Sequence, residues 1–299
     1  MDCPKCGRPN REEYRFCEID GTPLAAAPAA PTHAGCRCGA PADAVDEQGW
    51  CSACGRRAAR PSRDHREISC GPHLCAVSDR GKKHADNEDD FALATEVVDG
   101  RPVYVAVVCD GVSSSSNAAE AARAASAVAR EQLMVALRAG FAEPEASMRR
   151  AIRLANEAVC RQEALPGLRR DPPSTTIAAV AVRDRRAAIG WVGDSRVYCF
   201  SAQGGEQLTV DHAAGHALTR CLGAPAPGDD REAPEPDVKV LEVPEGAWLL
   251  VCTDGLWNYA PEPERLAALA GDADPARRLV EFAVAAGGKD NVTVAVLRL

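Results

Sequence analysis

The chain has 299 residues, 46% of them hydrophobic and 26% charged, a composition typical of a folded globular protein and not of a disordered one. Its 35 Lys and Arg against 43 Asp and Glu give a net charge of -8, which argues against binding of nucleic acid or an anionic membrane through bulk charge. Residues 1–67 carry ten acidic and ten basic residues, so the acidic excess lies entirely in the remainder, where we expect a cation site.

The cysteines and the N-terminus indicate the compartment. No apolar run approaches the ~18 residues that a membrane helix needs, and the first residues lack the apolar core of a signal peptide. Half of the 14 cysteines stand before residue 55 in close pairs, and the others are scattered singly. This pattern is typical of metal ligands and buried thiols in a reducing compartment. We therefore expect a cytoplasmic protein with no membrane partner.

Two cysteine-rich modules open the chain, at residues 1–24 and 25–67. The candidate zinc ligands of the first are Cys3, Cys6, Cys17 and Asp20. Those of the second, which has flanking linkers, are Cys36, Cys38, Cys51 and Cys54. Because zinc takes four ligands in a tetrahedron, the second module predicts a structural zinc ion. In the first, Asp20 stands where a cysteine is expected, so that module either binds zinc through three cysteines and Asp20 or binds it weakly or not at all.

Both modules resemble small zinc ribbons. In such ribbons the metal folds a short chain that has too little core of its own. They often mediate protein contacts, so we expect a protein partner for them. Sparse aromatic residues and the net charge give no support to a nucleic-acid partner.

Residues 68–299 alternate short apolar runs with longer helical ones, which indicates a single α+β domain. The predicted strands are rich in β-branched residues and are Val103–Cys109, Thr175–Val182, Ile189–Val192, Trp248–Cys252 and Val292–Leu297. Helical periodicity is clear over Ala125–Leu137 and Met148–Val159. A last helix is expected to start at Asp274-Pro275, an N-cap and first-turn pair. The residues expected on its buried face are Leu279, Phe282, Ala283 and Ala286.

Aspartates recur at the ends of the predicted strands. Asp110 and Asp254 each follow an apolar strand and precede a glycine, and Asp290 stands just before the last strand. If that strand is antiparallel to the others, its start shares an edge with their ends, and the three carboxylates converge. Glu88 and Asp89 add two more. Carboxylates gathered in this way repel one another without a cation, and oxygen ligands without histidine suit Mg²⁺ or Mn²⁺.

The order of these motifs resembles the metal-dependent protein phosphatase family, also called PPM or type 2C, from about Ser78 to Leu299. The matching motifs are Ser78-Asp79-Arg80-Gly81, Asn87-Glu88-Asp89, Val108-Cys109-Asp110-Gly111, Ser174-Thr175-Thr176, Gly193-Asp194-Ser195-Arg196, Leu208-Thr209-Val210-Asp211-His212, Thr219-Arg220-Cys221-Leu222-Gly223, Thr253-Asp254-Gly255-Leu256-Trp257 and Lys289-Asp290-Asn291-Val292-Thr293. Each motif is weak alone, and the nine in the family's order make a strong signal.

The resemblance implies a four-layer α-β-β-α sandwich with a binuclear Mn²⁺ or Mg²⁺ centre at one edge. Asp110 would bridge both ions, and the Gly111 carbonyl would bind one of them. Asp254 and Asp290 would complete the site of the first ion. Glu88 and Asp89 would hold the second ion and its waters.

The resemblance also implies roles for other residues. Asp171 stands where many bacterial relatives bind a third metal ion, although an ordinary loop role fits it equally well. The turn Gly193–Arg196 is interpreted as structural, and Asp211 and His212 are open to the same interpretation.

The implied activity is hydrolysis of phosphoserine and phosphothreonine in proteins. A hydroxide bridging the two ions would attack phosphorus in line, with Asp110, Asp254 and Asp290 as the catalytic metal ligands. The substrates would be phosphoproteins, the targets of a partner serine/threonine kinase. The alternative is a catalytically silent domain of the same fold that binds or scaffolds phosphoproteins.

Three features depart from the family pattern. The arginine that often grips the substrate phosphate is replaced by His84, which would serve as the catalytic phosphate-binding residue when protonated, or be replaced in that role by Lys83. No histidine follows Asp110-Gly111 to act as a general acid. The segment between Asp211-His212 and Leu218 is only a few residues long, so the flap of many bacterial relatives is expected to be missing.

Overall fold

The computed structural model describes residues 39–45, 51–55, 64–162, 171–215, 217–223 and 233–299. The chain divides into two compact units, Met1–Pro61 and Ser62–Leu299. In the first unit, the described residues form a short 3-10 helix, η1 (Ala42–Ala44), and a β-bridge that joins Val45 to Cys51.

Six of the eight predicted zinc ligands lie outside the described residues, namely Cys3, Cys6, Cys17, Asp20, Cys36 and Cys38. Of the other two, Cys51 is buried and Cys54 is half-buried. The two ribbons and their zinc ions therefore stay predictions.

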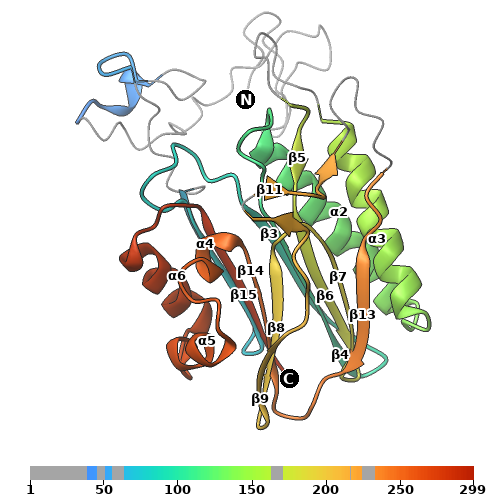
Figure 1. The fold of residues 1–299 in the computed structure, drawn as a ribbon. Coiled ribbons are helices and arrows are strands. Elements are labelled where there is room, and N and C mark those ends of the chain that lie inside the picture. Colours follow the sequence, from blue (N-terminus) through green and yellow to red (C-terminus); the bar gives the residue numbers. More distant parts are fainter. Residues whose placement is uncertain (1–38, 46–50, 56–63, 163–170, 216, 224–232) are drawn as a thin grey trace, which may run out of the picture. The chain divides into compact units, whose positions relative to one another are not determined.

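The second unit is built on two antiparallel sheets (Figure 1). The six-stranded sheet has the order β1 (His65–Cys70), β2 (Leu74–Asp79), β15 (Val292–Arg298), β14 (Trp248–Cys252), β8 (Arg196–Ser201) and β9 (Gly204–Gln207). The five-stranded sheet has the order β13 (Asp237–Glu242), β7 (Arg186–Val192), β6 (Ile177–Arg183), β4 (Arg101–Cys109) and β3 (Asp90–Val98). Two short pairs accompany them, β10 (Ala213–Ala214) with β11 (Ala217–Leu218) and β12 (Leu222–Gly223) with β5 (Ser174–Thr175).

Helices cover the outer face of each sheet, as Figure 1 shows. The five-stranded sheet carries α2 (Ala118–Arg138) and α3 (Pro144–Cys160). The six-stranded sheet carries α4 (Asp254–Trp257), α5 (Pro263–Ala270) and α6 (Pro275–Ala286). Three apolar clusters fill the spaces between the layers. The first lies between the five-stranded sheet and its helices, the second between the two sheets, and the third between the six-stranded sheet and its helices. This is the predicted order of layers, α-β-β-α. No helix among the described residues is long and apolar enough to cross a membrane.

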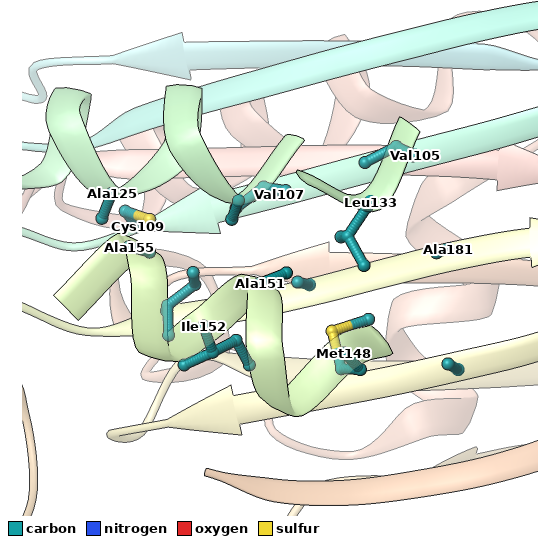
Figure 2. Packing of buried hydrophobic residues seen from close by; sticks show 14 of the residues in the cluster. Val105, Val107, Cys109, Ala125, Leu133, Met148, Ala151, Ile152, Ala155 and Ala181 are labelled. Atoms are coloured by element: carbon teal, nitrogen blue, oxygen red, sulfur yellow. The ribbon is translucent and has the colours of Figure 1, made fainter. Parts of the chain in front are cut away.

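Close packing in the first cluster follows from residue size (Figure 2). The inner face of α2 is rich in alanine, including Ala125, which lets the helix lie close to Cys109 and Val107 of β4. On α3 the larger Met148 and Ile152 face the sheet over Gly190, where a Cβ atom would meet Met148 Cγ at 2.4 Å. The helical spacing read from the sequence therefore matches the observed core.

The predicted strands are confirmed with one division. The run Thr175–Val182 forms two strands, β5 and β6, separated at Thr176, whose hydroxyl accepts a hydrogen bond from the Asp110 N–H. The first described strand, β1, starts at His65, three residues before the predicted start of the phosphatase domain at residue 68.

The last helix also follows the prediction, with one correction. Asp274 is the N-cap of α6, but its backbone is left-handed (φ 49°) and its side chain makes no capping hydrogen bond. Leu279 and Ala283 are buried, whereas the prediction that Ala286 lies on the buried face was wrong, since it is exposed in the last turn. Val280 is buried instead, so the apolar stripe is displaced by one residue around the helix.

Candidate metal centre

Acidic residues from four strand ends meet at one end of the sandwich. In the five-stranded sheet, the pairing of Asp90 with Cys109 places Asp89, just before β3, beside Asp110, just after β4. In the six-stranded sheet, β14 and β15 are antiparallel, and Thr253 donates its N–H to the Thr293 carbonyl. The end of one strand and the start of the other therefore share an edge, as predicted for Asp254 and Asp290.

Burial and mutual repulsion perturb these carboxyl groups. Burial raises the pKa of Asp110 well above its usual range, and the charges of Asp89, Asp254, Asp194 and Asp290 raise it further. Burial also raises the pKa of Asp89, against hydrogen bonds from threonines that lower it. The pKa of Asp254 rises to about 7, first through burial and then through Asp290 and Asp194. A group of carboxylates in this state is stabilised by a cation.

Two of the buried oxygens lack a partner among the described residues. These are Asp89 Oδ1 and Asp254 Oδ1. The other oxygen of Asp89 accepts a hydrogen bond from Thr253 Oγ1 at 3.0 Å, and Asp254 Oδ2 accepts one from Asn258 at 3.1 Å. A buried acceptor without a donor is costly. Each free oxygen is thus available to a metal ion, and hard anionic oxygens are the ligands that Mg²⁺ and Mn²⁺ prefer.

The donors do not by themselves close around an ion. Among the described residues, no three His, Cys, Asp or Glu side chains are gathered tightly enough to form a finished metal site. A cation bound here would take part of its coordination from water and backbone carbonyls, as Mg²⁺ commonly does. The donor set fits such an ion, because it combines unpartnered carboxylate oxygens with acidic charge and no histidine or cysteine.

Two threonines position Asp110 through its backbone. The Asp110 N–H donates to Thr176 Oγ1 at 3.0 Å, and the Asp110 carbonyl accepts from Thr175 Oγ1 at 2.7 Å. The next residue is Gly111, where a Cβ atom would come within 2.6 Å of the Glu88 carbonyl. Only glycine lets these backbone segments approach so closely. The Ser-Thr-Thr motif thus supports the acidic strand end, where the Asp110 carboxyl lies against that of Asp254.

A second scaffold ties the Asn-Glu-Asp segment to the last strand. Asn291 accepts the Glu88 N–H at 2.7 Å and donates to the carbonyls of Arg80 (2.8 Å) and Asp86 (3.1 Å). Because Asn291 follows Asp290 directly, one buried amide fixes two groups of acids relative to each other. Ser113 on the loop before α2 donates its hydroxyl to Glu88 Oε2 at 2.6 Å, so Glu88 is held through both backbone and side chain.

The predicted phosphate-binding residues lie beside this site. His84 Nε2 is 3.1 Å from Asp290 Oδ1, and both side chains are partly exposed, at 30% and 43%. The Lys83 side chain is exposed. His84 therefore lies beside the carboxylate cluster, where its ring contacts the carboxylate of Asp290.

Asp171, the predicted third-metal ligand, is exposed. Its backbone carbonyl accepts hydrogen bonds from the Ser116 N–H at 2.8 Å and the Ser116 hydroxyl at 3.1 Å. These contacts fit the loop role that the sequence left open.

The structure brings in Asp194, which the sequence analysis assigned to a structural turn. Asp194 is half-buried, and burial raises its pKa. Its charge acts on Asp110 and Asp254. The sequence does contain a signal for a role at the cluster. Asp194 comes shortly after the end of β7, just as Asp110 follows the end of β4.

The rest of that turn does have a structural role. Arg196 forms a forked ion pair with Asp211, with a shortest N–O distance of 2.7 Å, and stacks over the Trp257 ring at 3.8 Å. His212 Nδ1 accepts the Gly193 N–H at 3.1 Å, and its Nε2 is 2.9 Å from Asp237. Asp211 and His212 therefore hold the turn in shape.

Comparison with known proteins gives one consistent result. The family described as "Protein phosphatase 2C" matches residues 80–286. The serine/threonine phosphatase stp of Listeria monocytogenes is 30% identical over 241 residues, which cover 73% of this chain and 92% of stp. The solved catalytic domain of the phosphatase PstP in complex with two manganese ions is 26% identical, with a TM-score of 0.54, over 78% of this chain and 97% of that domain.

Other curated relatives match over a smaller share of their length. The protein phosphatase PhpP of Streptococcus pneumoniae is 30% identical over 143 residues, 42% of this chain and 58% of PhpP. PstP of Mycobacterium tuberculosis is matched over 44% of its length. The chain thus spans about half the length of these relatives.

Proposed function

Because this chain belongs to the protein phosphatase 2C family, we propose that it is a metal-dependent phosphatase that hydrolyses phosphoserine and phosphothreonine in proteins. The observation that carries the proposal is the pair of buried, unpartnered carboxylate oxygens, Asp89 Oδ1 and Asp254 Oδ1, within a cluster of mutually repelling acids. A purely structural cluster would have its acceptors satisfied.

We assign the metal ligands as follows. Asp110 would contact two ions, Asp254 and Asp290 would complete one site, and Glu88 and Asp89 would serve the other. The Gly111 carbonyl is a further donor. The relative PstP has been solved with two manganese ions, which supports Mn²⁺ or Mg²⁺ over other metals. A third ion at Asp171 would bind through an exposed side chain.

Two such cations lower the pKa of a water molecule and stabilise charge on the transferred phosphoryl group. The chain's own residues position this chemistry. Thr175 and Thr176 fix the backbone of Asp110, Asn291 fixes Glu88 relative to Asp290, and Ser113 orients the Glu88 carboxylate. On the open side of the cluster, protonated His84 or Lys83 would attract the anionic phosphate. Proton delivery to the leaving oxygen would fall to solvent, since no histidine follows Gly111.

The substrates would be phosphoproteins made by a partner serine/threonine kinase. The two N-terminal modules would bind one or two structural zinc ions and engage a protein partner. The cysteine spacing supports both assignments. Zinc content measured by mass spectrometry in the full chain and in Cys51→Ser tests it, with one or two zinc ions per chain expected and a loss of one in the variant.

Phosphate release from a phosphothreonine peptide tests the activity. The full chain is assayed with Mn²⁺, Mg²⁺ or EDTA, beside Asp110→Asn and Asp254→Asn, and Mn²⁺ binding is followed separately by calorimetry. We expect release that requires Mn²⁺ or Mg²⁺ and is lost in both folded variants. A folded chain that binds Mn²⁺ yet releases no phosphate would contradict the proposal and favour a silent phosphoprotein-binding domain.

A further inference from the structure

Lysine is rare in this chain and is concentrated in one place. Among 35 basic residues only five are lysines, at positions 5, 82, 83, 239 and 289. Three of them, Lys82, Lys83 and Lys289, stand on the two loops that enter β3 and β15. Arginine fills nearly every other basic position, so this grouping calls for a reason specific to the two loops.

The two loops touch beside the carboxylate cluster. The Lys82 N–H donates to the Gly288 carbonyl at 2.7 Å. A Cβ atom on Gly81 would lie 2.3 Å from the Asp290 carbonyl, so the backbones are in direct contact. A contact of 3.1 Å between His84 Nε2 and Asp290 Oδ1 joins the same loops. The three lysines therefore border the candidate metal centre from one side.

Their charges are free for a ligand within the described part of the chain. All three side chains are exposed, and none of the ion pairs found among the described residues involves them. By contrast, Lys239 lies 3.7 Å from Glu206. A lysine ammonium is a compact, strongly hydrated charge on a flexible stem, whereas an arginine fork would bind carboxylates bidentately. Next to a cluster of acids, lysines stay available where arginines would be captured.

We infer that Lys82, Lys83 and Lys289 form a lysine rim that selects phosphorylated segments with Asp or Glu beside the phosphorylated residue. The inference rests on the proposed function and names its substrate class. In an extended peptide each residue adds ~3.3 Å, and exposed charges act over ~8 Å at physiological ionic strength. The rim would therefore attract acidic side chains that lie within about two residues of the phosphorylated residue.

The rim also answers an electrostatic problem of the site. An acidic phosphopeptide approaches a chain of net charge -8. Three unpaired cations at the edge of the candidate metal centre lower the barrier to approach, and they do so most for the most acidic segments. A segment with neutral flanks gains only the attraction on its phosphate.

Three phosphothreonine peptides test the rim, with two flanking Glu, two Gln or two Lys residues. For the native chain we expect kcat/KM about tenfold higher for the Glu peptide than for the Gln peptide, a preference that fades in 0.5 M NaCl. Each of Lys82→Gln, Lys83→Gln and Lys289→Gln should lower that ratio about twofold, and the triple variant should abolish it. Lys239→Gln, which removes a lysine away from the rim, is the matched control and should keep the native ratio.

Binding separates this inference from the proposed function. Fluorescence anisotropy of the same peptides on the folded Asp110→Asn chain reports selection without turnover. In one outcome, the native chain hydrolyses neither p-nitrophenyl phosphate nor any peptide, while the Glu peptide binds more tightly than the Gln peptide and loses this advantage in the triple lysine variant. In that case the enzyme proposal fails and the rim stands. If peptides are hydrolysed but the triple variant retains the native Glu-to-Gln ratio, the rim is overturned and the enzyme stands.

Discussion

Two clusters of charged residues lie at strand ends in this domain and differ in how their charges are satisfied. Around Arg196, the acid Asp211 is paired through two guanidinium nitrogens, and Trp257 stacks on the cation. Burial lowers the pKa of Arg196, but its hydrogen bonds to Asp211 and Tyr198, together with the nearby negative charge, raise it, and the net shift is upward. Around Asp110 the charges are all of one sign, and two buried oxygens have no partner among the described residues. The first cluster is complete without a ligand, whereas the second leaves buried oxygens that are available to a cation.

The largest expected effect comes from removing a charge in the unsatisfied cluster. Asp254→Asn should lower phosphatase activity by more than ~10²-fold, because an amide replaces one of the proposed anionic metal ligands. In EDTA at pH 8 the same variant should be more stable than the native chain by about 1 kcal/mol, since it relieves repulsion. Activity assays and urea unfolding check both. A variant that is destabilised in EDTA would show that the cluster is structural.

The satisfied cluster should respond in the opposite way. Asp211→Ala leaves a largely buried guanidinium without its partner and should cost about 3 kcal/mol of unfolding free energy, with or without Mn²⁺. Replacing both partners, Arg196→Met with Asp211→Leu, should restore most of that loss. Denaturant unfolding in EDTA and in Mn²⁺ gives the answer. Equal stability of Asp211→Ala and the native chain would show that the Arg196–Asp211 pair does not stabilise the fold, and the two clusters would no longer differ in this respect.

The pH dependence of stability sharpens the comparison further. The pKa of Asp254 in the folded chain is about 7, above its value in an unfolded chain, so the folded state binds its proton more tightly. Its contribution is complete below about pH 4 and is lost as pH rises through 7. In EDTA we therefore expect the melting temperature to fall by roughly 5 °C between pH 6 and pH 8. Saturating Mn²⁺ should remove this fall, and a fall of the same size in Asp254→Asn would refute the assignment.

The smallest effect is expected at Ser113, which orients Glu88 from an exposed loop. Ser113→Ala removes one hydrogen bond to a carboxylate and should weaken Mn²⁺ binding by about fivefold. Ser113→Thr keeps the hydroxyl and should bind nearly as the native chain does. The neighbouring exposed Ser114 supplies the control Ser114→Ala. Calorimetric titration with Mn²⁺ measures all three, and identical affinities would leave Ser113 without a positioning role.

Local sequence patterns were sufficient to predict most of the core helices and strands. The β-branched runs ended close to the observed ends of β4, β14 and β15, because burial on both faces demands continuous apolar residues. The helical stripe of α3 was equally clear. The sequence patterns did not predict β2, β3 or β8, and they also missed the less regular segments. The edge strands β1 and β13 are half-exposed and polar, and they are strands only because a neighbour supplies hydrogen bonds. Ala286 was misplaced because the period alone does not say which side of a last turn meets the sheet.

By itself, the sequence determined that acids stand at the ends of apolar strands and that their order is the phosphatase order. Both are properties of short segments. Only the tertiary structure decided which of these acids meet, because convergence depends on pairing between strands far apart in the chain, as for Asp110 and Asp254. It brought Asp194 toward the cluster, left Asp171 in solvent, and turned His84 toward Asp290. It also left two carboxylate oxygens buried without donors, a property that exists only once the chain around them has folded.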